Sequence, residues 1–235
     1  MATRKALSIQ HKDIFKAIHR SQHCQRNWNL DKKIPQEDID MIMESITQCP
    51  SKQNRAFYKV HLVQDRDIIE TIHSYSDGCG QQHIGPTFTT TNTQVLAHLC
   101  IIFEQLPIKQ FVRREYGLNL ALVQKIDLST IDFEKHIVDT DLVAEIERDV
   151  LKDQNMAMGI AAGYANLSAS LLGYSTGCCA CFDGYAVKDL LGLESAPELI
   201  MGIGIPGEKP RRVHHYDDSI TFRTNKKQPI PVTHF

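Results

Sequence analysis

Two short polar stretches, His19-Arg20-Ser21-Gln22-His23 and Pro50-Ser51-Lys52-Gln53-Asn54, decide how this chain is interpreted. Each combines hydroxyl or amide side chains with cationic or potentially cationic ones, just outside a segment with helical spacing. Such groups form hydrogen bonds and suit an anionic ligand better than they suit a hydrophobic core. The two stretches therefore predict a binding site for a polar, anionic ligand.

The periodicity of apolar residues predicts a helix before each stretch. The first helix covers about residues 13–19. The second begins after Pro35 with acidic residues in its first turn, where the helix dipole favours them, and it must end before Pro50. Both stretches are therefore expected where a helix has just ended.

The rest of the chain mixes strands and helices without strict alternation. Strands are predicted at 57–63, 95–103, 174–182 and 199–205, and helices at 67–75, 141–172 and 187–191. The run at 95–103 is apolar almost throughout, as in a strand that is buried on both faces. This mixture predicts an α+β fold.

We expect a single domain over residues 1–235, with two parts outside its regular core. An irregular excursion at about 104–140 either caps a pocket as a lid or packs on the surface. A C-terminal tail at about 213–235 is too polar for a core element.

The predicted helix at 141–172 is apolar nearly all round. Its large residues recur at offsets of three and four, and its small residues permit close packing of another backbone: Met156, Ile160, Tyr164, Leu167 and Leu171, with Gly159, Ala161, Ala162, Gly163 and Ala165. Such a helix belongs in the centre of a fold or at a subunit interface.

The composition excludes several classes of protein. The chain has 235 residues, 42% of them hydrophobic, and a net charge of -2, which argues against binding nucleic acid through its phosphates. No stretch approaches the roughly 20 apolar residues that span a bilayer, and the first ten residues contain no apolar signal-peptide core. The seven cysteines are odd in number and irregularly spaced, so we expect reduced thiols in a cytoplasmic protein.

Two further motifs have competing interpretations. Cys178-Cys179-Ala180-Cys181 contains a C-x-x-C pair, but no second pair lies at a distance suited to structural zinc, and small buried thiols are the favoured interpretation. Lys209, Arg211 and Arg212 follow a predicted strand, so they either bind a phosphate at the end of that strand or form a solvated face.

Taken in order, these motifs resemble those of the FMN-dependent nitroreductase family. The resemblance covers about residues 10–100 and 150–212. It rests on His19-x-Ser21-x-His23, Pro50-Ser51-x-x-Asn54, the apolar helix at 155–172, Ala180-Cys181-Phe182-Asp183, and Gly204-Ile205-Pro206 before Lys209 and Arg211.

The resemblance implies an FMN site whose residues fall into three groups. Those around the phosphate and ribityl chain would be His19, Arg20, Ser21, Lys209 and Arg211. Those that contact the isoalloxazine ring, from the partner subunit, would be Pro50, Ser51 and Asn54. His23 would lie near the pyrimidine edge, the backbone amides of Ala180 and Cys181 near the reactive nitrogen, and Asn92 would be a further FMN-binding position.

The resemblance also implies a central mixed or antiparallel sheet flanked by helices, in an intertwined homodimer. The activity would be transfer of a hydride from NAD(P)H, through FMN, to a small electron-poor acceptor such as a nitroaromatic, quinone or enone, by a ping-pong mechanism without a catalytic side chain. Alternatives are a flavin-binding protein without turnover, dehalogenation or flavin fragmentation on the same fold, and a cysteine-based metal-binding module.

The chain departs from the family at two places. Family members usually carry Arg or Lys where this chain has His19 and His23, and histidine titrates near neutrality whereas a guanidinium stays charged. Ala56-Phe57 replaces the more usual Gln-Pro, which changes the expected ring contacts there.

Overall fold

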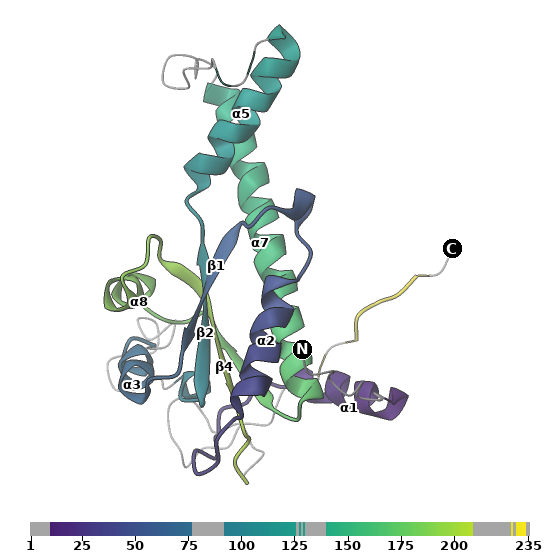
Figure 1. The fold of residues 1–235 in the computed structure, drawn as a ribbon, viewed down its shortest axis with the longest axis vertical. Helices are drawn as coiled ribbons and strands as arrows, with labels where there is room; N and C mark the ends of the chain where they lie inside the picture. The colour runs from purple at the N-terminus through teal and green to yellow at the C-terminus, as the bar shows by residue number, and fades with distance from the viewer. Residues whose placement is uncertain are drawn as a thin grey trace, which may run out of the picture.

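A single antiparallel sheet organises the computed structural model, which describes residues 10–76, 92–125, 127, 129, 140–208, 227 and 229–233 (Figure 1). The strand order is β1-β2-β4-β3, with β1 at Tyr58–Val63, β2 at Leu99–Gln105, β4 at Pro197–Gly204 and β3 at Ser175–Cys179. Every neighbouring pair is antiparallel. The predicted α+β class is confirmed, and of the two expected sheet types the antiparallel one is observed among the described strands.

The two faces of the sheet are covered by different helices. Leu99, Ile101 and Phe103 face the core formed with α2 (Gln36–Thr47) and α7 (Thr140–Leu171). Cys100 and Ile102 face the other core, formed with α3 (Arg66–Ser74) and α8 (Gly184–Leu191). Because side chains alternate along a strand and both faces are covered, β2 is apolar at nearly every position, as predicted. The strand begins later than predicted because residues 93–95 form a short 3-10 helix, η2 (Thr93–Val95).

The expectation of an irregular excursion at about 104–140 is wrong over Ile108–Gln124, which forms helix α5. This helix packs against the N-terminal half of α7, and together they extend beyond the end of the sheet (Figure 1). Phe111 and Val112 contribute to a small third core with Ile146 and Val150. Gly117 in the interior of α5 is unfavourable for a helix, so the sequence gives a weak helical signal here.

The end of β2 fixes the loop that precedes β4. Glu104 is only 1% exposed and accepts hydrogen bonds from the Ser195 amide, at 2.6 Å, and from His61, at 2.7 Å. Burial raises the pKa of this carboxyl, but these hydrogen bonds outweigh it and hold the pKa below the usual 4.5. The loop at Ser195 is therefore bound to a charged side chain of the sheet.

Helix α1 (His11–Ser21) lies across the C-terminal end of α7, at the end of the molecule away from α5 (Figure 1). Most of the tail predicted at 213–235 lies outside the described residues. Among the helices that the structure describes, none is both long and apolar enough to cross a bilayer.

Candidate functional site

The first polar stretch is attached to the C-terminal end of α7. The Arg20 guanidinium donates to the Ser170 carbonyl at 2.7 Å, and the Asn166 amide donates to the Ser21 carbonyl at 2.9 Å. The last carbonyls of a helix lack partners within the helix and attract cations, so Arg20 both satisfies one of them and benefits from the helix dipole. The guanidinium has five donors and can still bind a ligand.

The two histidines of this stretch are exposed. The ring of His19 lies 4.3 Å from that of Phe15, and its Nδ1 is 3.3 Å from the side-chain nitrogen of Gln22. His23 follows the end of α1 on the same exposed surface. Both can therefore reach a ligand that approaches the end of α1 from solvent.

The second polar stretch forms a tight turn after α2, and part of it lines a pocket. Gln53 and Asn54 both have a φ of 54°, and the Ser51 hydroxyl closes the turn by donating to the Arg55 carbonyl at 2.6 Å. Ser51 and Asn54 line a pocket of about 510 Å³ between the end of α2 and β1, whereas Pro50 is exposed beside it. The turn therefore presents hydroxyl and amide groups at the edge of a cavity of ligand size.

One wall of this pocket is formed by Tyr58 and Cys49. The Tyr58 hydroxyl lies 2.8 Å from the Cys49 sulfur and donates to the Ile46 carbonyl at 3.2 Å. Burial, followed by the contact with Cys49, raises the pKa of Tyr58 above its usual value of 10. The Tyr58 phenol therefore stays protonated at neutral pH.

A third group of predicted residues meets at the end of β3. Asn92 is buried, and its amide donates to the Ser76 carbonyl at 2.6 Å and to the Cys181 carbonyl at 3.0 Å. Ala180 is exposed next to Cys181. The structure therefore places Asn92 against Cys181, with Ala180 next in the chain.

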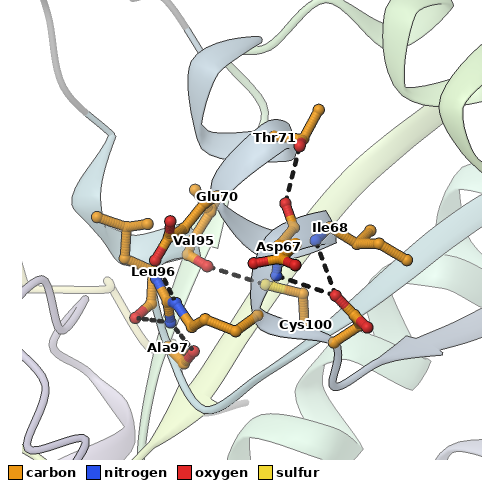
Figure 2. Close-up of polar contacts among 10 residues, drawn as sticks. Asp67, Ile68, Glu70, Thr71, Val95, Leu96, Ala97 and Cys100 are labelled. Atoms are coloured by element: carbon orange, nitrogen blue, oxygen red, sulfur yellow. Dashed lines mark hydrogen bonds and ion pairs between the residues drawn. The ribbon is translucent and has the colours of Figure 1, made fainter.

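The loop after Asn92 is held rigidly against α3. Arg66 donates to the carbonyls of Leu96 and Ala97, at 3.2 and 3.1 Å, and the Cys100 thiol donates to the Val95 carbonyl at 3.0 Å (Figure 2). These contacts fix η2 and the turn after it. Asn92 is thereby held by η2, which follows it in the chain, and by its hydrogen bonds to the Ser76 and Cys181 carbonyls.

Sequence reasoning missed two residues of this network. Arg26 donates to the Gln94 side-chain oxygen, and the Gln94 amide donates to the Asn92 side-chain oxygen at 3.3 Å. This chain of contacts links the segment after the first stretch to Cys181. Neither Arg26 nor Gln94 belongs to a motif, so their own sequence neighbourhood gave no sign of this role.

The first and second stretches lie far apart within one chain, as the positions at which they contact α7 show. Arg20 contacts Ser170, and Lys52 forms an ion pair with Asp153 at 2.6 Å. These two positions on α7 are 17 residues apart, which corresponds to about 26 Å along the axis at about 1.5 Å per residue. One chain alone therefore does not bring Ser21 and Asn54 to a common cavity.

The remaining residues that the sequence singled out are the cysteines at the end of β3 and the cations that follow β4. Burial raises the pKa of the Cys179 thiol to about 11, so this thiol is protonated at neutral pH. Cys178 is exposed, so the interpretation of small buried thiols holds for Cys179 and is wrong for Cys178. Within the described ranges, no group of three or more His, Cys, Asp or Glu side chains is arranged to hold a metal ion. Lys209 and Arg211, with Arg212, lie outside the described residues.

Comparison with known proteins adds independent evidence. The model of the nitroreductase family, described as "Nitroreductase family", matches residues 20–207. A search of curated proteins finds no significant match.

Several solved structures share the fold at low identity. A Staphylococcus epidermidis protein provisionally assigned as an NAD(P)H:FMN oxidoreductase is 18% identical, with a TM-score of 0.57 over 95% of this chain and 98% of that one. A nitroreductase-like protein from Streptococcus mutans is 14% identical, with a TM-score of 0.57 over 95% of this chain and 100% of that one. A nitroreductase family protein from Streptococcus pneumoniae is 19% identical, with a TM-score of 0.54 over 89% and 100%. The predicted fold is confirmed.

Proposed function

The chain belongs to the nitroreductase family, and we propose that it is an FMN-dependent oxidoreductase that takes a hydride from NAD(P)H and reduces a small electron-poor molecule. The observation that carries this proposal is the placement of the two polar stretches. Each is attached to α7 and contains groups that can reach a ligand. In this proposal each would supply a different half of the site that the family resemblance implies.

We infer that a homodimer completes the site, because α7 exposes a continuous apolar face. Ile160 and Tyr164 on this face are 40% and 44% exposed, and Met156 continues it towards the N-terminus. Gly159 and Gly163 lie between them, and a Cβ added to either would meet no atom within 4 Å. An apolar face with glycines at its centre permits close approach of a second copy of the helix.

The location of these glycines supports a shared site. Gly159 and Gly163 lie close to the midpoint between Asp153 and Ser170, the residues that hold the second and first stretches. A two-fold axis near this midpoint would place the first stretch of one protomer beside the second stretch of its partner. The separation of about 26 Å within a chain then becomes proximity between chains.

The donor set in this arrangement fits FMN. His19, Arg20 and Ser21, with Lys209 and Arg211, would hold the phosphate and ribityl chain. From the partner subunit, the segment containing Pro50, Ser51 and Asn54 would contact the ring. Asn92, Ala180 and Cys181 would lie by the ring nitrogens, and His23 by the pyrimidine edge.

Bound FMN would supply the redox chemistry, since it accepts a hydride from NAD(P)H and passes it to an acceptor such as a nitroaromatic, quinone or enone in a ping-pong cycle. The residues of the chain orient donors towards positions that become negative, and they keep those donors preorganised. The buried Asn92 does this indirectly, because it fixes the Cys181 carbonyl and so the direction of the neighbouring amides.

The two exposed histidines favour one second candidate, a flavin-binding protein without turnover. If His23 is neutral, the pyrimidine edge lacks the positive charge that would stabilise anionic reduced flavin there. Other chemistries of the fold, dehalogenation and flavin fragmentation, would depend on the segment that contains α5.

The absorbance spectrum of the purified protein distinguishes these candidates. A flavin spectrum that NADH or NADPH bleaches is the expected result, and a flavin spectrum that neither bleaches would indicate the binding protein. A colourless protein that stays colourless after incubation with FMN would refute the proposal, and stoichiometric zinc in it would indicate a metal-binding module.

Mixing two variants tests whether the site is shared between subunits. His19→Glu repels the phosphate, and Asn54→Gly removes a ring contact while it preserves the left-handed backbone. Each variant alone should bind FMN weakly. Random pairing of the two after unfolding and refolding should restore about a quarter of the sites, because half of the dimers are mixed and each has one intact site. If the mixture binds no more FMN than its components, the site is not shared.

A further inference from the structure

The turn that carries Ser51 and Asn54 is attached at three points to the hairpin formed by α5 and α7. We propose that this hairpin is a clamp that fixes the orientation of Ser51 and Asn54, with Arg55 and Lys52 as positioning residues. The inference rests on the proposed function, in which Ser51 and Asn54 contact the flavin ring of the partner's site.

The backbone of the turn needs support from its surroundings. Gln53 and Asn54 are consecutive non-glycine residues with a φ of 54°. Side chains other than glycine disfavour this left-handed region, so two such residues in succession persist only where neighbouring contacts hold them. The hydrogen bond from Ser51 to the Arg55 carbonyl lies within the turn and cannot attach it to the rest of the fold.

Two ion pairs attach the turn to the hairpin. Lys52 pairs with Asp153 of α7 at 2.6 Å, and Arg55 pairs with Glu115 of α5. Arg55 and Asp153 are each 8% exposed, so neither charge is well solvated without its partner. Separating a buried charge from its partner is strongly unfavourable, and the turn should therefore follow the position of the hairpin.

The third attachment is apolar and involves a residue that departs from the family pattern. Phe57 is fully buried, and its ring lies 5.0 Å from that of Phe111 of α5. Its carbonyl accepts hydrogen bonds from the Leu106 amide at 3.1 Å and from the Gln154 side chain at 3.3 Å. Where family members usually have proline, this chain has an aromatic residue that belongs to the core of the hairpin.

The three attachments lie on both sides of Asn54. Lys52 and Arg55 flank it within two residues, and Phe57 follows before β1 begins. A change at the base of α5 would therefore be transmitted to the ring-contacting side chains without any contact between α5 and the flavin. The hairpin thus has a positioning role that is separate from any role as a lid.

Glu115→Gln tests the clamp, because it removes the charge on α5 while it keeps the size of the side chain. The matched control is Glu194→Gln, which breaks an exposed ion pair between Glu194, in the loop before β4, and Lys59 of the neighbouring strand β1. The first measurement uses protein without flavin. Trypsin cleavage after Lys52 or Arg55 should accelerate about fivefold or more in Glu115→Gln and remain unchanged in the control.

The second measurement is the affinity for FMN, at a protein concentration where the dimer is intact. Glu115→Gln should bind FMN about tenfold more weakly than the control and should shift the visible circular dichroism of the bound flavin. Asp153→Asn, which breaks the pair with Lys52, is a second variant that should change both measurements in the same direction.

The clamp is refuted if Glu115→Gln and Asp153→Asn match the control in cleavage rate and FMN affinity. A lower thermal midpoint with both measurements unchanged also refutes it, because this would show a contribution to stability alone. If the wild-type protein binds no FMN, the proposed function fails, but the cleavage rates still decide whether the hairpin holds the turn.

Discussion

Replacing Gly159 and Gly163 together should change the stability of one chain and the association of two chains in opposite directions, depending on the size of the new side chains. Both glycines lie inside α7, and a Cβ at either position meets no atom within 4 Å. Glycine in a helix interior is about 0.8–1 kcal/mol less favourable than alanine. The double alanine variant should therefore gain up to about 2 kcal/mol in the stability of a single chain, or a thermal midpoint about 4–8 °C higher.

Larger side chains at these positions should have the opposite effect on the dimer. If two copies of α7 meet here, leucine at both positions places four bulky side chains where the helices approach. Overpacking an interface of this kind costs about 1–3 kcal/mol for each insertion. The double leucine variant should consequently weaken dimerisation at least about a hundredfold, or about 2.7 kcal/mol, and it should lose FMN binding with it.

Sedimentation velocity over a concentration series, with FMN absorbance recorded in the same cell, measures both effects. The control is Glu147→Leu, which adds an apolar side chain at an exposed position of α7 within the hairpin. A double leucine variant that dimerises as tightly as the wild type would show that α7 is not the dimer interface. A wild-type protein that remains monomeric with bound FMN would refute the shared site itself.

Three further predictions concern stability and pH. Phe57→Ala should cost about 3–5 kcal/mol in urea unfolding, whereas Phe15→Ala, at a residue that is 63% exposed in one chain, should change the stability of the monomer by less than about 0.5 kcal/mol. Folding lowers the pKa of Glu104, so its carboxylate contributes fully to the free energy of unfolding above pH 4.5, the usual pKa of Glu, and this contribution is lost as the pH falls through the lower pKa of the folded state. Over this acidic range, the free energy of unfolding should therefore decline less steeply for Glu104→Gln than for the wild type. His23→Arg should make the flavin reduction potential less dependent on pH, and an unchanged potential-versus-pH curve would contradict the role assigned to His23.

The elements of the fold that could be predicted are those whose packing leaves a periodic pattern. Helix α2 has proline before it and proline soon after it, and three isoleucines face the sheet between them. Strand β2 is covered on both faces and so is apolar over its first five residues. Helix α5 was not predicted although Ile108, Phe111 and Val112, which pack in the third core, follow helical spacing. Gly117 in its interior is unfavourable for a helix and obscures the pattern.

The chemistry of the site was easier to predict than its geometry. The motifs suggested Ser51 and Asn54, which the structure places at a pocket, and the family resemblance added Asn92, which the structure places beside Cys181. Nothing in the sequence indicated that Arg20 and Lys52 would contact α7 17 residues apart, since that distance depends on how three separate helices pack. Contacts between residues distant in the sequence, such as that of Arg26 with Gln94, also depend on tertiary packing.

The apolar surface of a single chain and the separation of its two half-sites have one common explanation. Ile14, Phe15 and Ile18 are exposed on α1, and Met156, Ile160 and Tyr164 are exposed on α7, against which α1 packs. A monomer would leave these apolar side chains in water, which is unfavourable. In the proposed dimer, a second copy related by a two-fold axis at the glycines would cover the surface of both chains. The same operation would unite the two halves of each site, so covering this surface and completing the site would be one event.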